Sequence, residues 1–152
     1  MVERGSEPDT VVVPVDDSPL SDDALEYAIE HHPDSKLVVL HVIDIWQQSY
    51  TVAERPGAAP GTYLKTLDEY AHDQAQAILD EADQVAQEHG VSVTTETETG
   101  QVPRTIVEYA DEHDVDGIVI GSHGRTGATR ILLGSVAEKV MRQAPCPVTV
   151  VR

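Results

Sequence analysis

The part of the sequence best suited to chemistry is a glycine-rich segment near the carboxyl end. It reads GSHGRTG over residues 121–127 and LLGSV over residues 132–136. Glycine lets a backbone turn with positive φ and approach a ligand closely. Free N–H groups at the amino end of a following helix attract phosphate oxygens. Because His123, Arg125 and Arg130 add positive charge to the same segment, it predicts a site for an anion, most simply a phosphate.

The spacing of these residues excludes several other kinds of site. The sequence contains no Gly-Lys-[Ser/Thr] and no GxGxxG, so it has neither a Walker A loop nor a dinucleotide fingerprint. Residues 121–124 lack the GxSxG spacing of a nucleophile elbow. The seven histidines show neither H-x3-H nor HExxH spacing, so no structural metal site is expected. His41 is interpreted as a satisfied core residue, and Cys146, the single cysteine, as a packing residue.

The charge of the chain is unusually acidic and unevenly spread. Asp and Glu number 27 against 10 Lys and Arg, which gives a net charge of −17. Residues 121–152 nevertheless carry +4, with Glu138 as their only acid. This balance argues against binding to nucleic acid or to anionic membranes. It also suggests a halophilic host, a hypothesis that predicts stability rising toward molar KCl and that a flat salt dependence would contradict.

Apolar runs alternate with helical patterns along the chain and indicate one α/β domain. Strands are expected over residues 11–15, 37–45, 91–99, 116–120 and 147–151, and helices over residues 19–32, 63–89, 103–113 and 135–142. This alternation predicts an open, five-stranded, parallel, doubly wound sheet of Rossmann-like form. In such sheets ligands bind at the carboxyl ends of the strands.

The limits of the domain are predicted from the polar ends and the unpatterned segments. Residues 1–9 are expected to be a flexible tail, residues 10–152 the domain, and residues 46–62 a long loop. No apolar run reaches the length of a membrane span, and no signal peptide is recognisable. We therefore expect a cytoplasmic protein.

Three motifs together resemble the universal stress protein family of the ATP-binding type. The pattern Gly-x2-Gly-x9-Gly-[Ser/Thr] of that family is matched in full by Gly121, Gly124, Gly134 and Ser135. The first-strand motif Val-Asp-x-Ser and the closing Ala-Pro-Cys-Pro-Val (residues 144–148) also fit, and the similarity extends from Thr10 to Arg152. The resemblance implies a sheet with strand order 3-2-1-4-5.

The resemblance also implies a role for each residue of a nucleotide site. Asp16 would bind the ribose, Pro14 and Val15 would line the adenine pocket, and the Val42 backbone would meet the adenine. The remaining residues would surround the ribose and hold the phosphates: Ile120, Gly121, Ser122, His123, Gly124, Arg125, Gly134, Ser135 and Val136. ATP with Mg²⁺ or Mn²⁺ is the implied ligand. The family further implies a homodimer in which Pro147–Val151 pairs across a two-fold axis.

Three functions stay open at this point. The leading one is an ATP-binding stress-response or signalling module with at most slow hydrolysis, since no catalytic constellation is visible. A related adenylating enzyme is disfavoured, because residues 16–19 (DDSP) lack the glycines of its loop. A dimeric module that binds AMP, a cyclic nucleotide or no nucleotide is the third. Asp16 has an alternative role as a helix cap, and Gly121 and Gly124 have one as ordinary turn glycines.

Overall fold

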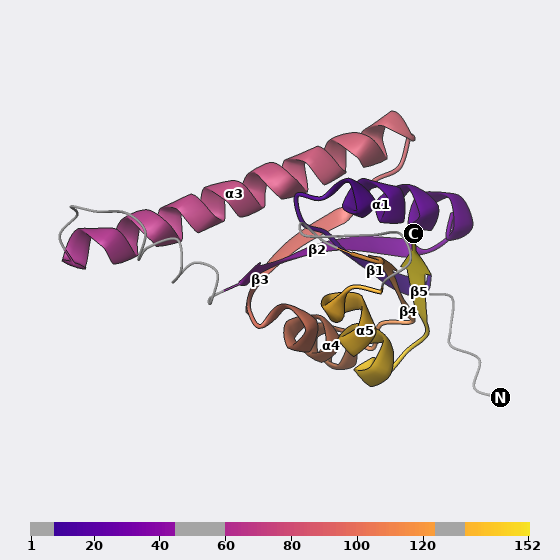
Figure 1. Ribbon diagram of the computed structural model, residues 1–152. Coiled ribbons are helices and arrows are strands. Elements are labelled where there is room, and N and C mark those ends of the chain that lie inside the picture. The colour runs from indigo at the N-terminus through magenta and orange to yellow at the C-terminus, as the bar shows by residue number, and fades with distance from the viewer. Residues whose placement is uncertain (1–7, 45–59, 124–132) are drawn as a thin grey trace.

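The computed structural model describes residues 8–44, 60–123 and 133–152, with side chains in the helix that begins at Pro60 described from Asp68 onward. Its strands are β1 (Thr10–Pro14), β2 (Lys36–Asp44), β3 (Thr94–Gly100), β4 (Gly117–Gly121) and β5 (Val148–Val151). Its helices are α1 (Pro19–His31), α3 (Pro60–Glu88), α4 (Val102–Glu112) and α5 (Ser135–Gln143). Figure 1 shows these elements in one compact body, beyond which α3 extends.

The five strands form one parallel sheet in the order β3-β2-β1-β4-β5. The predicted fold class and strand order are therefore confirmed. β1 lies at the centre and is buried from Val11 to Pro14, which explains its continuous apolar run. β3 lies at one edge, where its alternating Thr and Glu residues remain largely exposed.

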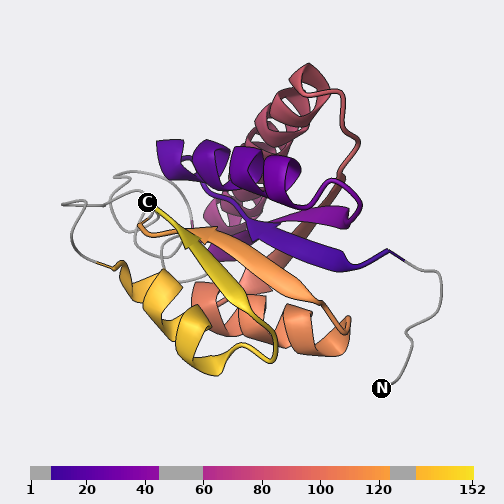
Figure 2. The same ribbon diagram turned by 90° about the vertical axis from the view of Figure 1, so that its right-hand side faces the viewer.

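Helices of the described ranges cover both faces of the sheet, as Figure 2 shows. α1 and α3 pack on one face over a core that includes Val13, Leu25 and Val39. α4 and α5 pack on the other face over a core that includes Leu40 and Ile118. Because successive residues of a strand point to opposite faces, each inner strand supplies both cores.

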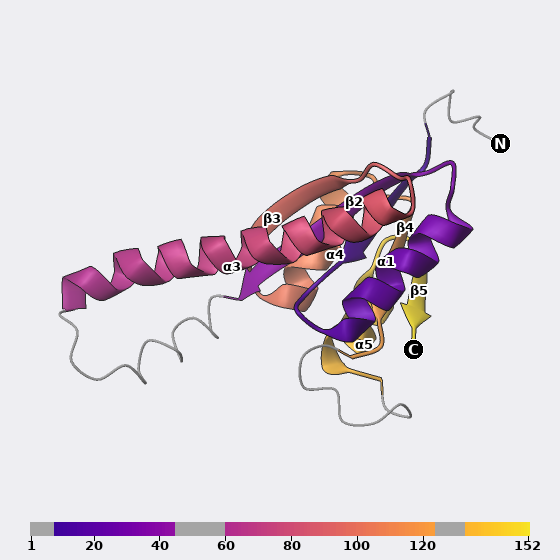
Figure 3. The same ribbon diagram turned by 90° about the horizontal axis from the view of Figure 1, so that it is seen from above.

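α3 is the longest helix, and only part of it packs on the sheet. Its buried side chains, among those described, are Ala71, Ala75, Ile78, Leu79, Ala82 and Ala86. Figure 3 shows the amino-terminal part of the helix extending past the sheet. The helix begins three residues earlier than predicted, at Pro60, which suits the first turn because proline has no N–H to leave unpaired. The rest of the predicted 46–62 loop lies outside the described residues.

α3 ends in the glycine-containing motif that its sequence predicts. Gly90 has φ of 70° and donates its N–H to the Gln87 carbonyl at 2.9 Å. Val91 donates to the Ala86 carbonyl, also at 2.9 Å. These two bonds satisfy carbonyls that the end of a helix leaves free, and they turn the chain toward β3. In the described ranges, none of the helices combines the length and apolar character needed to cross a membrane.

Candidate functional site

The carboxyl ends of β1 and β4 are neighbours at the centre of the sheet. β1 leads into α1 on one face, whereas the chain that follows β4 returns as α5 on the opposite face. The direction of winding therefore reverses between these two strands. A reversal of this kind leaves a crevice outside the strand ends, where doubly wound proteins bind ligands.

Gly121, at the end of β4, lies directly against the first turn of α1. A Cβ at this position would meet the Leu20 Cβ at 3.0 Å and the Leu20 carbonyl oxygen at 3.2 Å. Positive φ is not the reason for glycine here, because Gly90 and Gly100 are the positive-φ glycines of the described residues. The expectation that Gly121 turns the backbone with positive φ is therefore wrong, and close packing against α1 explains why a residue without a Cβ stands here.

Gly134, the N-cap residue of α5, lies directly against the backbone of Ser122. Its N–H donates to the Ser122 carbonyl at 2.6 Å, and a Cβ on it would lie 2.6 Å from the same oxygen. The Ser122 N–H in turn donates to the Val151 carbonyl at 2.8 Å. Ser122 is 3% exposed, and its Oγ lies 3.3 Å from Nδ1 of His123. The backbone of Ser122 thus joins the end of β4 to both β5 and the start of α5.

The amino end of α5 presents backbone donors at this crevice. Gly134 is the N-cap residue, and no side chain caps the helix there. The first helical bond runs from the Glu138 N–H to the Gly134 carbonyl at 3.0 Å. The amides of residues 135–137 therefore have no acceptor in the described part of the chain. Such amides, together with the positive end of the helix dipole, form a site for phosphate oxygens.

Asp16 follows the end of β1, the strand that pairs with β4. Its Oδ1 accepts hydrogen bonds from the Ser18 N–H at 2.8 Å and from the Ser21 Oγ at 2.9 Å. The Asp16 N–H donates to the same Ser21 Oγ at 2.8 Å. Ser18 is the N-cap residue of α1, and its side chain makes no capping bond. Asp16 accepts from the Ser18 N–H and from a hydroxyl, but from no amide within α1, so the helix-cap alternative for Asp16 is not borne out. No described residue donates to Oδ2.

The other predicted site residues are positioned by the sheet. Pro14, Val15, Val42 and Ile120 are buried at or near the ends of the three central strands. Ser135 is exposed at the first position of α5, and Val136 packs at the edge of one core. Gly124, Arg125 and Arg130 lie outside the described residues. Ser21, which fixes the Asp16 carboxylate, was missed by sequence analysis, since it lies inside a helix and belongs to no motif.

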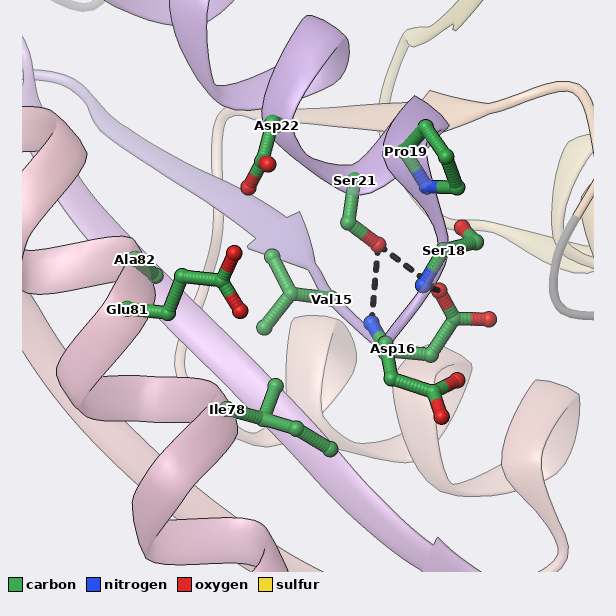
Figure 4. A pocket seen from close by; sticks show the side chains of 10 residues that line it. Val15, Asp16, Ser18, Pro19, Ser21, Asp22, Ile78, Glu81 and Ala82 are labelled. Carbon is green, nitrogen blue, oxygen red and sulfur yellow. Dashed lines mark hydrogen bonds between the residues drawn. The ribbon is translucent and has the colours of Figure 1, made fainter.

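An acidic hollow that the sequence did not predict lies beside Asp16, between α1 and α3. It encloses about 160 Å³, and Figure 4 shows the Asp22 and Glu81 carboxylates on the same side of it, near Val15. Burial raises the pKa of Asp22, and the negative charges of Glu81, Glu26 and Asp23 raise it further. Negative charge on these walls repels anions, so the hollow itself does not suit a phosphate. Among the described residues, no three His, Cys, Asp or Glu side chains are grouped to hold a metal ion.

Comparison with known proteins shows the family of the chain. The model of the universal stress protein family matches residues 8–152. The chain belongs to the universal stress protein family. It is 35% identical over 144 residues to the universal stress protein MJ0531 of Methanocaldococcus jannaschii, covering 93% of this chain and 81% of that protein.

Solved structures of the family share the fold. The universal stress protein UspA from Lactobacillus plantarum is 27% identical with a TM-score of 0.75, over 97% of this chain and 99% of that chain. A universal stress protein solved in complex with cAMP is 26% identical with a TM-score of 0.67, also over 97% and 99% of the two chains.

Replacing Gly134 tests the close contact between this residue and the Ser122 backbone. We expect Gly134→Ala to lower the free energy of unfolding by about 2 kcal/mol, because the added Cβ meets a backbone oxygen that cannot move aside. Gly117→Ala is the control, since a Cβ at the other end of β4 meets nothing closer than 3.8 Å. Urea denaturation measures both. Equal effects of the two substitutions would contradict the packing role of Gly134.

Asp22 makes the stability of this universal stress protein depend on pH. Because the folded state raises the pKa of this carboxyl, its ionisation costs stability above the ordinary value of 3.8, and the cost disappears below it. Asp22→Asn should therefore stabilise the protein at pH 7, on the order of 0.5 kcal/mol after solvent screening. The gain should vanish below pH 3.8. Thermal melts of both proteins across pH measure this, and a gain that persists in acid would contradict it.

Proposed function

We propose that this universal stress protein binds ATP in the crevice between β1 and β4 and acts as a nucleotide-dependent stress-response or signalling module, with at most slow hydrolysis. The observation that carries the proposal is the pairing of two complementary groups across the crevice. Asp16 offers a carboxylate oxygen on one side, and the α5 amino end offers uncapped amides on the other. A ribose with attached phosphates has hydroxyls for the first group and anionic oxygens for the second.

The division of charge supports an extended, anionic ligand in a defined orientation. The phosphates would lie on the amides of residues 135–137, with His123 nearby, at the start of the segment that carries +4. The ribose and base would lie toward Asp16 and Val42. The Ser135 hydroxyl, exposed at the first position of α5, would add one donor to the phosphate side.

A divalent ion would enter with the phosphates. Mg²⁺ prefers oxygen ligands and usually retains several waters. Because the described ranges hold no group of three candidate protein ligands, phosphate and water oxygens would supply most of its coordination. The ion would screen the phosphate charge near the acidic α1 end.

A monophosphate ligand is the second candidate, and one comparison favours it. A structural neighbour of the same family is solved in complex with cAMP. The Asp16 side of the crevice suits the ribose of either nucleotide. ATP and a monophosphate would therefore differ only in how many phosphate oxygens reach the α5 amides. ATP should bind more tightly than AMP or cAMP if all three amides of residues 135–137 are used.

We further propose that the protein is a homodimer formed through β5. This strand is the sheet edge opposite β3, and its four residues are apolar or Thr and only half-buried. An open apolar edge favours pairing with another strand. Sedimentation equilibrium should give twice the chain mass, and a monomer at micromolar concentration would contradict this proposal without affecting the nucleotide site.

Substitution of Asp16 tests the nucleotide site. Asp16→Asn keeps an oxygen for the Ser18 and Ser21 bonds but replaces the second carboxylate oxygen with a donor. We expect the affinity for Mg-ATP to fall about tenfold, as for a lost hydrogen bond to a charged group, while the affinity for 2′,3′-dideoxy-ATP stays unchanged. Calorimetric titration measures both affinities.

Asp17→Asn is the matched control, because it removes the same charge from the next residue. An equal loss in this control, or an equal loss for the dideoxy nucleotide, would show that Asp16 acts through general charge and not through the ribose hydroxyls. No binding of either nucleotide to the wild-type protein would contradict the proposed function itself.

A further inference from the structure

β2 continues past the end of its neighbour β1. The two strands remain paired up to Pro14 and Leu40, and the Val15 N–H donates to the Leu40 carbonyl at 2.9 Å. β2 then runs on to Asp44, still paired with β3 on its other side. The edge of β2 that faces β1 is therefore open beyond Leu40, at the crevice described above.

The alternation of a strand determines which peptide groups point into this opening. The N–H and C=O of one residue point to the same side of its strand, and those of the next residue point to the other side. Because the Leu40 carbonyl points to β1, both peptide groups of Val42 also point to the β1 side. In a continued parallel ladder, the Val42 N–H would donate to the Val15 carbonyl.

A side chain takes this acceptor instead. Nδ1 of His41 lies 2.8 Å from the Val15 carbonyl oxygen, and since a carbonyl can only accept, the ring nitrogen carries the hydrogen. The described residues contain no bond from the Val42 N–H to Val15 or to any side-chain acceptor. A buried amide that leaves its ladder needs another acceptor, from water or a ligand. The expectation that His41 is hydrogen-bonded within the fold is thus confirmed, although its side chain is half-buried and does not lie in the core.

We infer that His41 is a positioning residue that withholds the Val15 carbonyl from Val42 and so keeps the Val42 N–H and C=O free to read a purine base. This inference rests on the proposed function and deepens it. One donor and one acceptor from a single strand residue match the N1 acceptor and the N6 donor of adenine. Guanine presents an N1 donor and an O6 acceptor, so each group would face its own kind. With the ribose held at Asp16, this arrangement selects adenine over guanine.

Two substitutions separate the hydrogen bond from the volume of the side chain. His41→Leu removes the donor but keeps a branched side chain of similar reach. His41→Asn places an amide N–H at the position of Nδ1 and is the matched control. Calorimetric titrations with Mg-ATP and Mg-GTP, together with inorganic tripolyphosphate as a probe without a base, report on the site. Amide hydrogen exchange followed by NMR in the nucleotide-free protein reports on Val42 itself.

The wild type should show a fast-exchanging Val42 amide and a preference for ATP over GTP. In His41→Leu this amide should re-pair with Val15 and exchange about tenfold more slowly. ATP affinity should then fall five- to tenfold, by about the value of one hydrogen bond, with GTP and tripolyphosphate affinity unchanged. His41→Asn should retain the wild-type behaviour in both measurements.

Three results would overturn the inference. The first is a protected Val42 amide in the wild type, which needs no nucleotide and remains decisive even if the leucine variant does not fold. The second is an unchanged ratio of ATP to GTP affinity in His41→Leu. The third is an equal loss for ATP and tripolyphosphate, which would indicate general damage. A wild type with a fast Val42 amide that binds no nucleotide would contradict the proposed function, and the base-reading role would fall with it.

Discussion

The contact between Gly134 and the backbone of Ser122 determines the geometry of the whole candidate site. The 2.6 Å bond between them holds the amino end of α5 against the end of β4, and only a residue without a Cβ fits there. Gly121 makes the corresponding close contact with α1 through Leu20. These two contacts bring a helix amino end from each face of the sheet to the same crevice. Without them α5 and α1 would not begin beside the neighbouring ends of β4 and β1.

The two sides of the candidate site differ in charge. Hydrogen bonds to Asp16 fix one carboxylate oxygen toward α1, and the acidic hollow formed with Asp22 and Glu81 continues on that side. The α5 side offers backbone donors in a segment with a single acid. In the proposed complex, this separation would keep the phosphates away from the first side and draw them to the second. In a chain with a net charge of −17, this local separation matters more than the overall balance, which by itself would repel phosphate.

Sequence patterns predicted the architecture well, because buried parallel strands and amphipathic helices have distinct periodicities. The element types, their order and the Gly90 helix end followed from that rule and from glycine chemistry. Sequence analysis did not predict why glycine is required at positions 121 and 134. Each of these glycines is in close contact with residues that approach it only after folding. The same holds for the meeting of Asp22 with Glu81 and for the bond from His41 to Val15. Element ends shifted by one to three residues, as at β3, which begins at Thr94 and not at Val91. Gly124 and Arg125 lie outside the described residues, and their roles in phosphate binding remain predictions.

The most direct test of the central claim is to locate the ligand on the backbone, by following amide chemical shifts of the folded protein during a titration with Mg-ATP in molar KCl. If the crevice between β1 and β4 is the nucleotide site, the amides of residues 135–137 should shift and saturate together with that of Val42. Shifts confined to the acidic hollow, around Ile78 and Glu81, would contradict this account, and so would the absence of any saturable shift.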